Sequence, residues 1–334
     1  MARPVFPENG AVIDTHTPIQ NCFISMIHKQ GTEAALEWLL SAKNHRECSW
    51  PQPLTLQWED DGSDVYTVEL SETPDFRRCT VVRTQMTCCS VTNLKVGQIY
   101  FWRVDKGKAA CFSTVGNTYR FIHVEGLMNV RDIGGIRLRQ GMVYRGSEMQ
   151  GEYMLTEAGR KTFCEELGVR TEVSLRREKT EEPPYSCAGD TVRFRRLPYR
   201  PYREVFEPEH RVNICRIFDF LADSRNYPVY FHCLGGADRT GMIALYLRAL
   251  ARESDEEILT DYELTSLSMF AGGLTEGVAA EGFRCRNNDY FTEFLDGLRP
   301  YAPDGTLADQ VWAFLSDCGI QEKTLDRVMG LLCM

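Results

Sequence analysis

The sequence predicts an α/β domain preceded by a smaller all-β sandwich. Two patterns support this fold class. Over residues 50–115 apolar and polar residues alternate with the two-residue period of strands, whereas after about residue 116 short apolar strands alternate with amphipathic helices. The length of 334 residues is enough for two domains. We therefore predict a sandwich over residues 1–117 and, over residues 118–334, a mostly parallel central sheet flanked by helices.

Composition and charge exclude several classes of protein. Hydrophobic residues make up 43% and charged residues 25% of the chain, as in ordinary folded proteins. The formal net charge is −9, so the surface as a whole is not built to coat nucleic acid, and we predict no nucleic-acid partner. No window approaches ~18 uninterrupted apolar residues, so we predict no integral membrane segment.

The N-terminus and the cysteines bear on the cellular compartment. The first residues lack the apolar run of a signal peptide, so we expect a cytoplasmic protein; a secreted chain that had lost its leader would look the same. The chain contains 13 cysteines, an odd number, and several lie inside apolar patterns. This usage indicates free thiols in a reducing compartment. No group of residues has the spacing of a zinc or calcium site, so we predict neither a metal nor a cofactor.

The first domain contains candidate strands within residues 54–104, separated by polar turns. With Trp58, the Tyr66 strand and the aromatic run at 100–102 as its core, the segment resembles a fibronectin type III-like module. An amphipathic helix expected over residues 32–43 is then an insertion in this module. We expect the module to pack or to recruit a partner, and its residues do not specify which partner.

In the second domain, strand patterns alternate with the period of amphipathic helices. A capping-box pattern at residues 254–257 marks one further helix start. The helices are expected over residues 156–167, 209–223, 242–251, 291–299, 306–318 and 324–333.

The segment that carries chemistry is YFHCLGGADRTG, residues 230–241, between an apolar strand and an apolar helix. At such a junction several backbone N–H groups converge on one anion. Gly235 and Gly236 have no Cβ, so the backbone can come close to a phosphate. Five residues separate Cys233 from Arg239, which lets the sulfur lie beneath a tetrahedral oxyanion and the guanidinium beside it. The helix end also stabilises the thiolate, which makes Cys233 a nucleophile.

Three segments carry a resemblance to a known family. HCLGGADRTG, residues 232–241, resembles the H-C-x5-R signature of cysteine-dependent phosphatases, and its ending is similar to the atypical bacterial tyrosine phosphatases that also dephosphorylate phosphoinositides. NVRDIGG at 129–135, followed by VYRGS at 143–147, and DYELT at 261–265 are similar to further elements of that family. The resemblance covers residues 118–334 and implies a protein tyrosine phosphatase-like fold.

The chemistry of phosphomonoester cleavage gives the residues of this segment expected roles. Cys233 attacks the phosphorus in line, a phosphocysteine forms, and water hydrolyses it without a metal. Arg239 holds the phosphate oxygens together with the loop amides, and Thr240 can donate its hydroxyl to the sulfur. The phosphate-binding loop then consists of Leu234, Gly235, Gly236, Ala237 and Thr240.

The proton donor has two candidates. The resemblance implies that Asp238, inside the loop, is the general acid. Asp132 competes for this role, and its alternative is a turn residue or an ion-pair partner of Arg131 or Arg239. His232 is expected either to orient the loop and tune the thiolate or to be an ordinary hydrogen-bonded histidine at a strand end. We count His232, Asp132 and Arg131 as supporting residues.

Two positions depart from the family pattern. Ala237 stands where the family commonly has lysine, which removes a cation that would bind a second phosphate and weakens a phosphoinositide preference. Ser174 stands where the family usually has aspartate, so a buried carboxylate that holds neighbouring loops is missing. Separately, five arginines between residues 193 and 203 form either a solvated strand end or a patch that steers substrate.

These residues predict a phosphomonoester hydrolase, above all a cysteine-dependent protein-tyrosine phosphatase, with dual specificity for phosphoserine as an extension. The alternative enzyme is a phosphoinositide or inositol polyphosphate phosphatase. From a different class, the alternative is an interaction scaffold that binds phosphorylated partners; intact Cys233, Asp238 and Arg239 favour the enzyme. The expected partner is thus a phosphorylated protein, phospholipid or inositol phosphate substrate.

Overall fold

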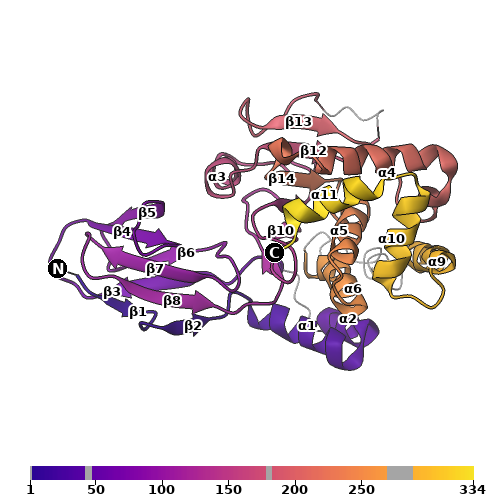
Figure 1. Cartoon of the computed structure of the whole chain (residues 1–334). Coiled ribbons are helices and arrows are strands. Elements are labelled where there is room, and N and C mark those ends of the chain that lie inside the picture. The colour runs from indigo at the N-terminus through magenta and orange to yellow at the C-terminus, as the bar shows by residue number, and fades with distance from the viewer. Residues whose placement is uncertain (1, 42–46, 178–182, 269–288) are drawn as a thin grey trace. The chain divides into compact units, whose positions relative to one another are not determined.

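The computed structural model describes residues 2–41, 47–177, 183–268 and 289–334 (Figure 1). The chain divides into two compact units, one formed by Met1–Thr17 with Pro51–Arg120 and the other by Pro18–Trp50 with Phe121–Met334. The sequence placed the division near residue 117 and assigned the whole N-terminal segment to the first domain. The structure differs in one respect, because residues 18–50 group with the second unit.

The first unit consists of two sheets that share one hydrophobic core. Along β3 every second side chain is buried, including Leu56 and Trp58, and Tyr66 and Trp102 of the facing sheet join them. One sheet has the order β1 (Pro4–Phe6), β3 (Leu54–Trp58), β6 (Cys88–Val91). The other has the order β2 (Ala11–Ile13), β8 (Ala110–Thr114), β7 (Ile99–Val104), β4 (Tyr66–Ser71), β5 (Cys79–Thr84).

The second unit is built on a six-stranded sheet, in agreement with the predicted α/β domain. Its order is β13 (Arg193–Arg196), β12 (Thr171–Ser174), β14 (Val229–His232), β11 (Val143–Gly146), β10 (Arg131–Asp132), β9 (Arg120–Phe121). The four strands from β13 to β11 run parallel, and β10 is antiparallel to β11. The carboxyl ends of β12, β13 and β14 therefore meet at one edge, where ligands bind in open α/β sheets.

Helices cover both faces of this sheet (Figure 1). One core contains Tyr230 together with Phe163 of the π-helical turn Thr162–Glu166, which continues α3 (Glu157–Lys161). The opposite core contains Phe231 and the remaining large helices: α4 (Pro208–Leu221), α5 (Asp238–Leu250), α9 (Asp289–Leu298), α10 (Leu307–Asp317) and α11 (Glu322–Leu332). All of these helices lie within a few residues of their predicted ranges.

Helix α6 (Asp255–Glu263) begins at the predicted capping box, in which Ser254 and Glu257 bond each other's backbone N–H groups. The 3₁₀ turn η4 (Leu264–Leu267) continues it. Shorter 3₁₀ turns are η2 (Tyr202–Phe206), η3 (Ser224–Asn226) and η5 (Arg299–Tyr301).

The segment at 18–50 contains two helices, α1 (Pro18–Gln30) and α2 (Thr32–Ser41). Hydrogen bonds link its end to the rest of the second unit: the Cys48 N–H donates to the Leu267 carbonyl (2.9 Å), and the Ser268 hydroxyl donates to Glu47 (3.2 Å). Buried Gln20 in turn donates to the Cys48 carbonyl (2.7 Å). These bonds attach the end of the segment 18–50 to the second unit, with which the helix predicted as an insertion also groups.

Two chain-wide features complete the description. The 12 cysteines in the described ranges are free thiols. None of the helices described is both long and apolar enough to cross a membrane.

Candidate active site

The loop that links β14 to α5 has the geometry of an oxyanion site. β14 ends at His232 and α5 begins at Asp238, so residues 233–237 form a short loop at the N-terminus of a long helix. All four carbonyl groups of residues 234–237 accept hydrogen bonds from outside the loop. Their donors are the Glu148 N–H (2.8 Å), Asn129 Nδ2 (3.1 Å), Arg145 Nη2 (2.8 Å) and the Gly241 N–H (2.7 Å), in that order.

These bonds orient the peptide groups of the loop. In a trans peptide the N–H points away from the preceding carbonyl, so the N–H groups of residues 235–238 point away from these donors. None of these N–H groups donates to a described residue. N–H groups left without a partner at a helix N-terminus can bind an anion.

Gly236 is required where the loop crosses the end of β11. Its φ is +68°, a left-handed conformation that side chains disfavour. A Cβ at this position would lie 2.4 Å from the carbonyl carbon and oxygen of Gly146. Both glycines belong to segments that the sequence singled out. Their close approach leaves no room for a side chain at Gly236, whereas a Cβ on Gly146 would collide with the Tyr230 hydroxyl.

Behind the loop, three buried arginines surround the buried carboxylate of Asp261. The Asp261 oxygens lie 2.8 Å from Arg145 Nη1, 3.2 Å from Arg248 Nη2 and 3.5 Å from Arg131 Nε. Burial alone would raise the pKa of Asp261, but the three guanidinium groups outweigh it and hold that pKa well below its usual range. Arg248 has a second buried partner in Glu253, at 2.6 Å.

This cluster shows what the segments outside the loop do together. Arg131 comes from the segment 129–135, Arg145 from 143–147 and Asp261 from 261–265. Asp261 holds Arg145, whose other nitrogen donates to the Gly236 carbonyl. Asn129 of the segment 129–135 bonds both the Gly235 carbonyl and Thr265 of the segment 261–265 (3.3 Å). The motifs therefore meet behind one loop and fix its backbone.

The structure places three side chains that the sequence predicted at or next to the loop. Cys233 is 2% exposed and lies directly after β14. Half-buried Arg239 makes no hydrogen bond or ion pair with any residue in the described ranges. The hydroxyl of Thr240 is buried and also has no hydrogen-bond partner among them. Of the other loop residues, Gly235, Gly236 and Ala237 are buried and Leu234 is half-buried.

His232 is held by a carboxylate that the sequence did not reveal. Its Nε2 donates to the carboxylate of Glu172 (3.0 Å), and both side chains are buried. Its Nδ1 lies 3.2 Å from the Cys233 carbonyl oxygen. Glu172 lies on the neighbouring strand β12, where a charged residue inside an apolar strand was the available signal.

Asp238 occupies the first position of α5 and is half-buried. The hydroxyl of Tyr202 donates a hydrogen bond to its Oδ1, and the same hydroxyl lies 2.8 Å from that of Tyr262. The sequence did not indicate this role for Tyr202, which lies 36 residues before Asp238 in an arginine-rich stretch.

Asp132 has a different environment. It is fully buried, and its two oxygens accept hydrogen bonds from the N–H groups of Gly134 (2.9 Å) and Gly141 (2.6 Å). Both oxygens thus hold the turn between β10 and β11. This corresponds to the turn role that the sequence left open beside the general-acid role.

Position 174 is a serine, as the sequence shows, and a buried carboxylate that contacts the neighbouring loops comes from another element. Buried Glu148 forms an ion pair with Arg176 and accepts a hydrogen bond from the Glu152 N–H (2.8 Å). The Glu148 N–H also donates to the Leu234 carbonyl of the loop. Glu148 therefore connects the segment after β12 to the loop that follows β14.

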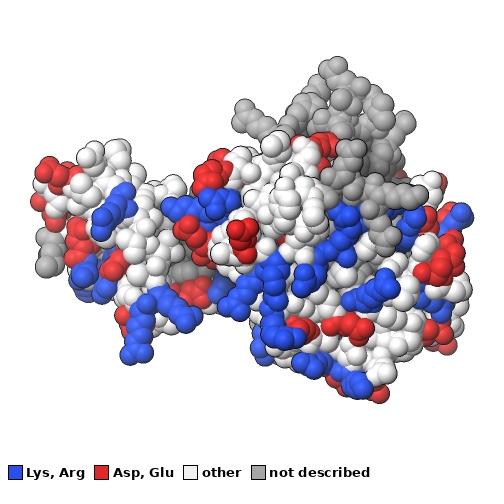
Figure 2. All heavy atoms as spheres, turned by 90° about the horizontal axis from the view of Figure 1, so that it is seen from above, with Lys and Arg blue, Asp and Glu red and all other residues white. Residues whose placement is uncertain are grey.

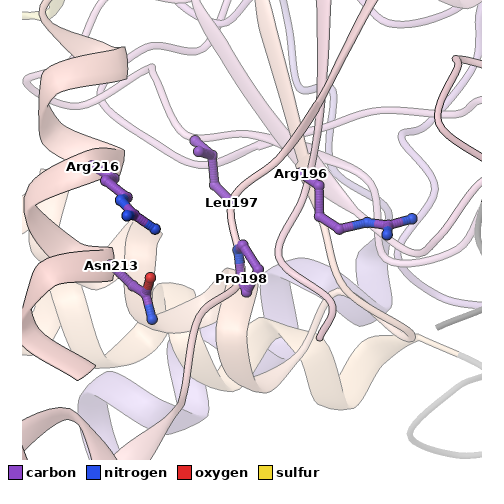
Figure 3. Close-up of a pocket in the computed structure, with 5 residues that line it drawn as sticks. All are labelled: Arg196, Leu197, Pro198, Asn213 and Arg216. Carbon is purple, nitrogen blue, oxygen red and sulfur yellow. The ribbon is translucent and has the colours of Figure 1, made fainter. Parts of the chain in front are cut away.

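The predicted arginine cluster does not converge on one point. Arg193 donates to Thr171 (3.1 Å), and Arg200 pairs with Glu204 (3.5 Å). Figure 2 shows basic side chains spread over the visible face, with acidic ones among them. A pocket of about 120 Å³ between the end of β13 and α4 is lined by Arg196, Leu197, Pro198, Asn213 and Arg216, and the Arg196 side chain points away from Arg216 (Figure 3).

One group among the described residues could offer three ligands to a metal. Glu207, Glu209 and His210 lie together at the start of α4, where both glutamates are exposed. Glu207 and His210 already pair with each other at 3.4 Å. None of these residues belongs to the loop.

Comparison with known proteins identifies the enzyme class. Residues 122–276 match the model of the tyrosine phosphatase family. This segment is a tyrosine phosphatase family domain. The chain is accordingly a phosphatase of the cysteine type. No curated protein matches the sequence.

Solved structures with similarity include the core catalytic domain of the PP-IP phosphatase SIW14 from S. cerevisiae in complex with citrate. It is 14% identical, the alignment covers 50% of this chain and 94% of that chain, and the TM-score is 0.30. A likeness of this size supports no conclusion about substrate.

Proposed function

We propose that this phosphatase hydrolyses phosphotyrosine in proteins, with Cys233 as the nucleophile and a phosphocysteine as the intermediate. The observation that carries the proposal is the phosphate loop itself. The carbonyl groups of residues 234–237 are held from outside the loop, and the N–H groups of residues 235–238, Arg239 and the Thr240 hydroxyl have no partner among the described residues. A tetrahedral dianion satisfies these groups together.

In the first step the Cys233 thiolate attacks phosphorus, and the bond from phosphorus to the tyrosine oxygen breaks. Asp238 gives its proton to the departing oxygen, which leaves as tyrosine hydroxyl. The loop N–H groups and Arg239 hold the equatorial oxygens throughout. The preorganised loop accounts for charge stabilisation without a large rearrangement.

In the second step water attacks phosphorus, and Asp238, now a carboxylate, accepts a proton from it. The sulfur–phosphorus bond breaks, Cys233 leaves as a thiolate, and inorganic phosphate is released. The unpaired hydroxyl of Thr240 is available to donate to this sulfur. In both steps every bond broken and every proton transferred is accounted for by Cys233, Asp238, the substrate and one water molecule.

The substrate class follows from the charges around the loop. The position before Asp238 is Ala237, so the loop carries no second cation for an additional phosphate. The net charge of −9 likewise favours a single phosphomonoester over an inositol polyphosphate. We extend the proposal to phosphoserine as a weaker substrate.

We also propose that the first unit is a fibronectin type III-like module that packs or recruits a partner. Its two sheets around one core, with Trp58, Tyr66 and Trp102 inside, support this proposal. For the whole protein we propose a reducing compartment such as the cytoplasm, because oxidation would disable an attacking thiolate.

If Asp238 is the general acid, the decrease in kcat caused by its replacement should depend on the leaving group of the substrate. The Asp238→Asn variant is expected to lose about 10²-fold in kcat on phosphotyrosine, which needs a proton for its phenoxide. On 2,4-dinitrophenyl phosphate, whose leaving group needs no proton, the loss is expected to stay below about 3-fold. Stopped-flow or steady-state rates on both substrates measure the difference.

The matched control is Asp219→Asn, which changes the same side chain at an exposed position of α4. It is expected to leave both rates unchanged. Equal losses on both substrates in Asp238→Asn would show that another group supplies the proton.

A further inference from the structure

The carboxylate of Asp238 is held by two tyrosines from distant parts of the chain. Tyr202 belongs to η2, after β13, and Tyr262 belongs to α6. The Tyr202 hydroxyl donates to Asp238 Oδ1, and the two tyrosine hydroxyl oxygens are 2.8 Å apart. Neither hydroxyl has a role in the two chemical steps described above.

The donors and acceptors fix the direction of this chain of hydrogen bonds. A tyrosine hydroxyl has one hydrogen to donate. Because Tyr202 gives its hydrogen to Asp238 Oδ1, it must accept from Tyr262. Oδ1 is therefore occupied by a donor, and the proton of the acid form belongs on Oδ2. The tyrosine pair thus selects which oxygen of Asp238 transfers the proton.

Tyr202 adopts a conformation that a bulky side chain seldom adopts. Its φ is +61°, in the left-handed region. Its N–H donates to the sulfur of Met242 (3.1 Å), and its ring stacks on Tyr290 with the centroids 6.1 Å apart. Such outliers persist where the surroundings determine them, and they gather at functional sites.

Close packing also fixes the position of the Tyr262 ring. Its ring stacks on Phe291 with 4.0 Å between the centroids and 7° between the planes. A Cβ on Gly241 would lie 2.8 Å from this ring, so the glycine of the loop segment is needed for the ring to approach α5. The residue before it, Asp261, holds the arginine that binds the loop. Neighbouring residues of α6 thus support the loop backbone and the acid.

We propose that Tyr202, oriented by Tyr262, is a positioning residue for Asp238. It holds Oδ1 so that Oδ2 delivers the proton to the leaving oxygen and later receives one from water. The inference rests on the proposed function, since it presumes that Asp238 is the general acid.

The test removes only the hydroxyl. The Tyr202→Phe variant is expected to lose about 10-fold in kcat on phosphotyrosine, with KM unchanged and with less than about a 2-fold loss on 2,4-dinitrophenyl phosphate. In the Asp238→Asn background the same substitution is expected to have no further effect, because the carboxylate it orients is gone. Tyr262→Phe is expected to cause a smaller loss of the same kind.

The matched control is Tyr199→Phe. Tyr199 lies in the same segment and shares a hydrogen bond with another tyrosine, Tyr246 (2.9 Å), but does not bond Asp238. It is expected to retain the rates on both substrates, with its folding checked by thermal unfolding.

The outcomes distinguish the positioning role of Tyr202 from the general-acid role of Asp238, on which it rests. If Asp238→Asn shows its selective loss while Tyr202→Phe behaves like Tyr199→Phe, the positioning role is overturned and the general acid stands. An additive loss in the double variant also overturns it. If Asp238→Asn itself shows no leaving-group dependence, the assignment of the acid fails first.

Discussion

Replacing Cys233 with serine is expected to lower kcat on phosphotyrosine by at least about 10⁴-fold. The serine hydroxyl is not ionised at neutral pH, and nothing in the loop is arranged to remove its proton. The loop amides and Arg239 are unchanged in this variant, so binding of vanadate or phosphate is expected to persist. Initial rates and an anion-binding titration measure the two effects separately.

Cys187→Ser provides the control for this result. Burial raises the pKa of the Cys187 thiol to about 12, so it has no reactive thiolate at neutral pH, and its replacement is expected to leave turnover intact. The same assays are to include phosphoserine and an inositol phosphate. Vanadate-sensitive turnover retained in Cys233→Ser would overturn the nucleophile, whereas faster turnover of the inositol phosphate would overturn the substrate class alone.

The largest effect on stability is expected for Asp261→Asn. This change keeps the shape of the side chain but removes the charge that three buried guanidinium groups share. Leaving buried charges without compensation costs about 3–5 kcal/mol of unfolding free energy. Asp317→Asn, which breaks a more exposed ion pair with Arg211, is expected to cost at most about 1 kcal/mol. Urea unfolding of both variants gives the comparison.

The effect of Asp261 is also expected to depend on pH. Its pKa in the folded protein is held well below the ~3.9 of an unfolded aspartate, despite the opposing effect of burial. A depressed pKa contributes stability above the unfolded value, and this contribution is lost as the pH falls toward the folded value. The difference between wild type and Asp261→Asn should thus be full near pH 7 and shrink below about pH 4. A difference that does not change with pH would contradict this electrostatic account.

Much of the site could be predicted from the sequence because its centre is local. A strand, two glycines and a helix start place Cys233 in one short loop and Arg239 and Thr240 in the first turn of the helix that follows, since chain geometry alone keeps them close. The resemblance added the motifs of Arg131, Arg145 and Asp261 but not their purpose. Their meeting behind the loop depends on how β10, β11 and α6 pack, which residue spacing does not encode.

The unpredicted residues act from a distance. Tyr202 reaches Asp238 across 36 residues of sequence, and Glu172 reaches His232 across 60. The sequence around a single tyrosine or glutamate does not indicate which distant residue its side chain bonds. The placement of residues 18–50 failed for a related reason, because an amphipathic helix reveals that one face is buried but not against which unit.

The most direct test of the central claim is to trap the intermediate. The full chain is mixed with a phosphotyrosine peptide, quenched within one turnover in an alkaline denaturant that preserves the sulfur–phosphorus bond, digested at alkaline pH and examined by mass spectrometry. The account predicts one phosphoryl group on the sulfur of Cys233, absent in Cys233→Ser and unaffected in Cys187→Ser. Turnover with no phosphoryl group on Cys233 at any quench time, or with the group on another residue, would contradict it.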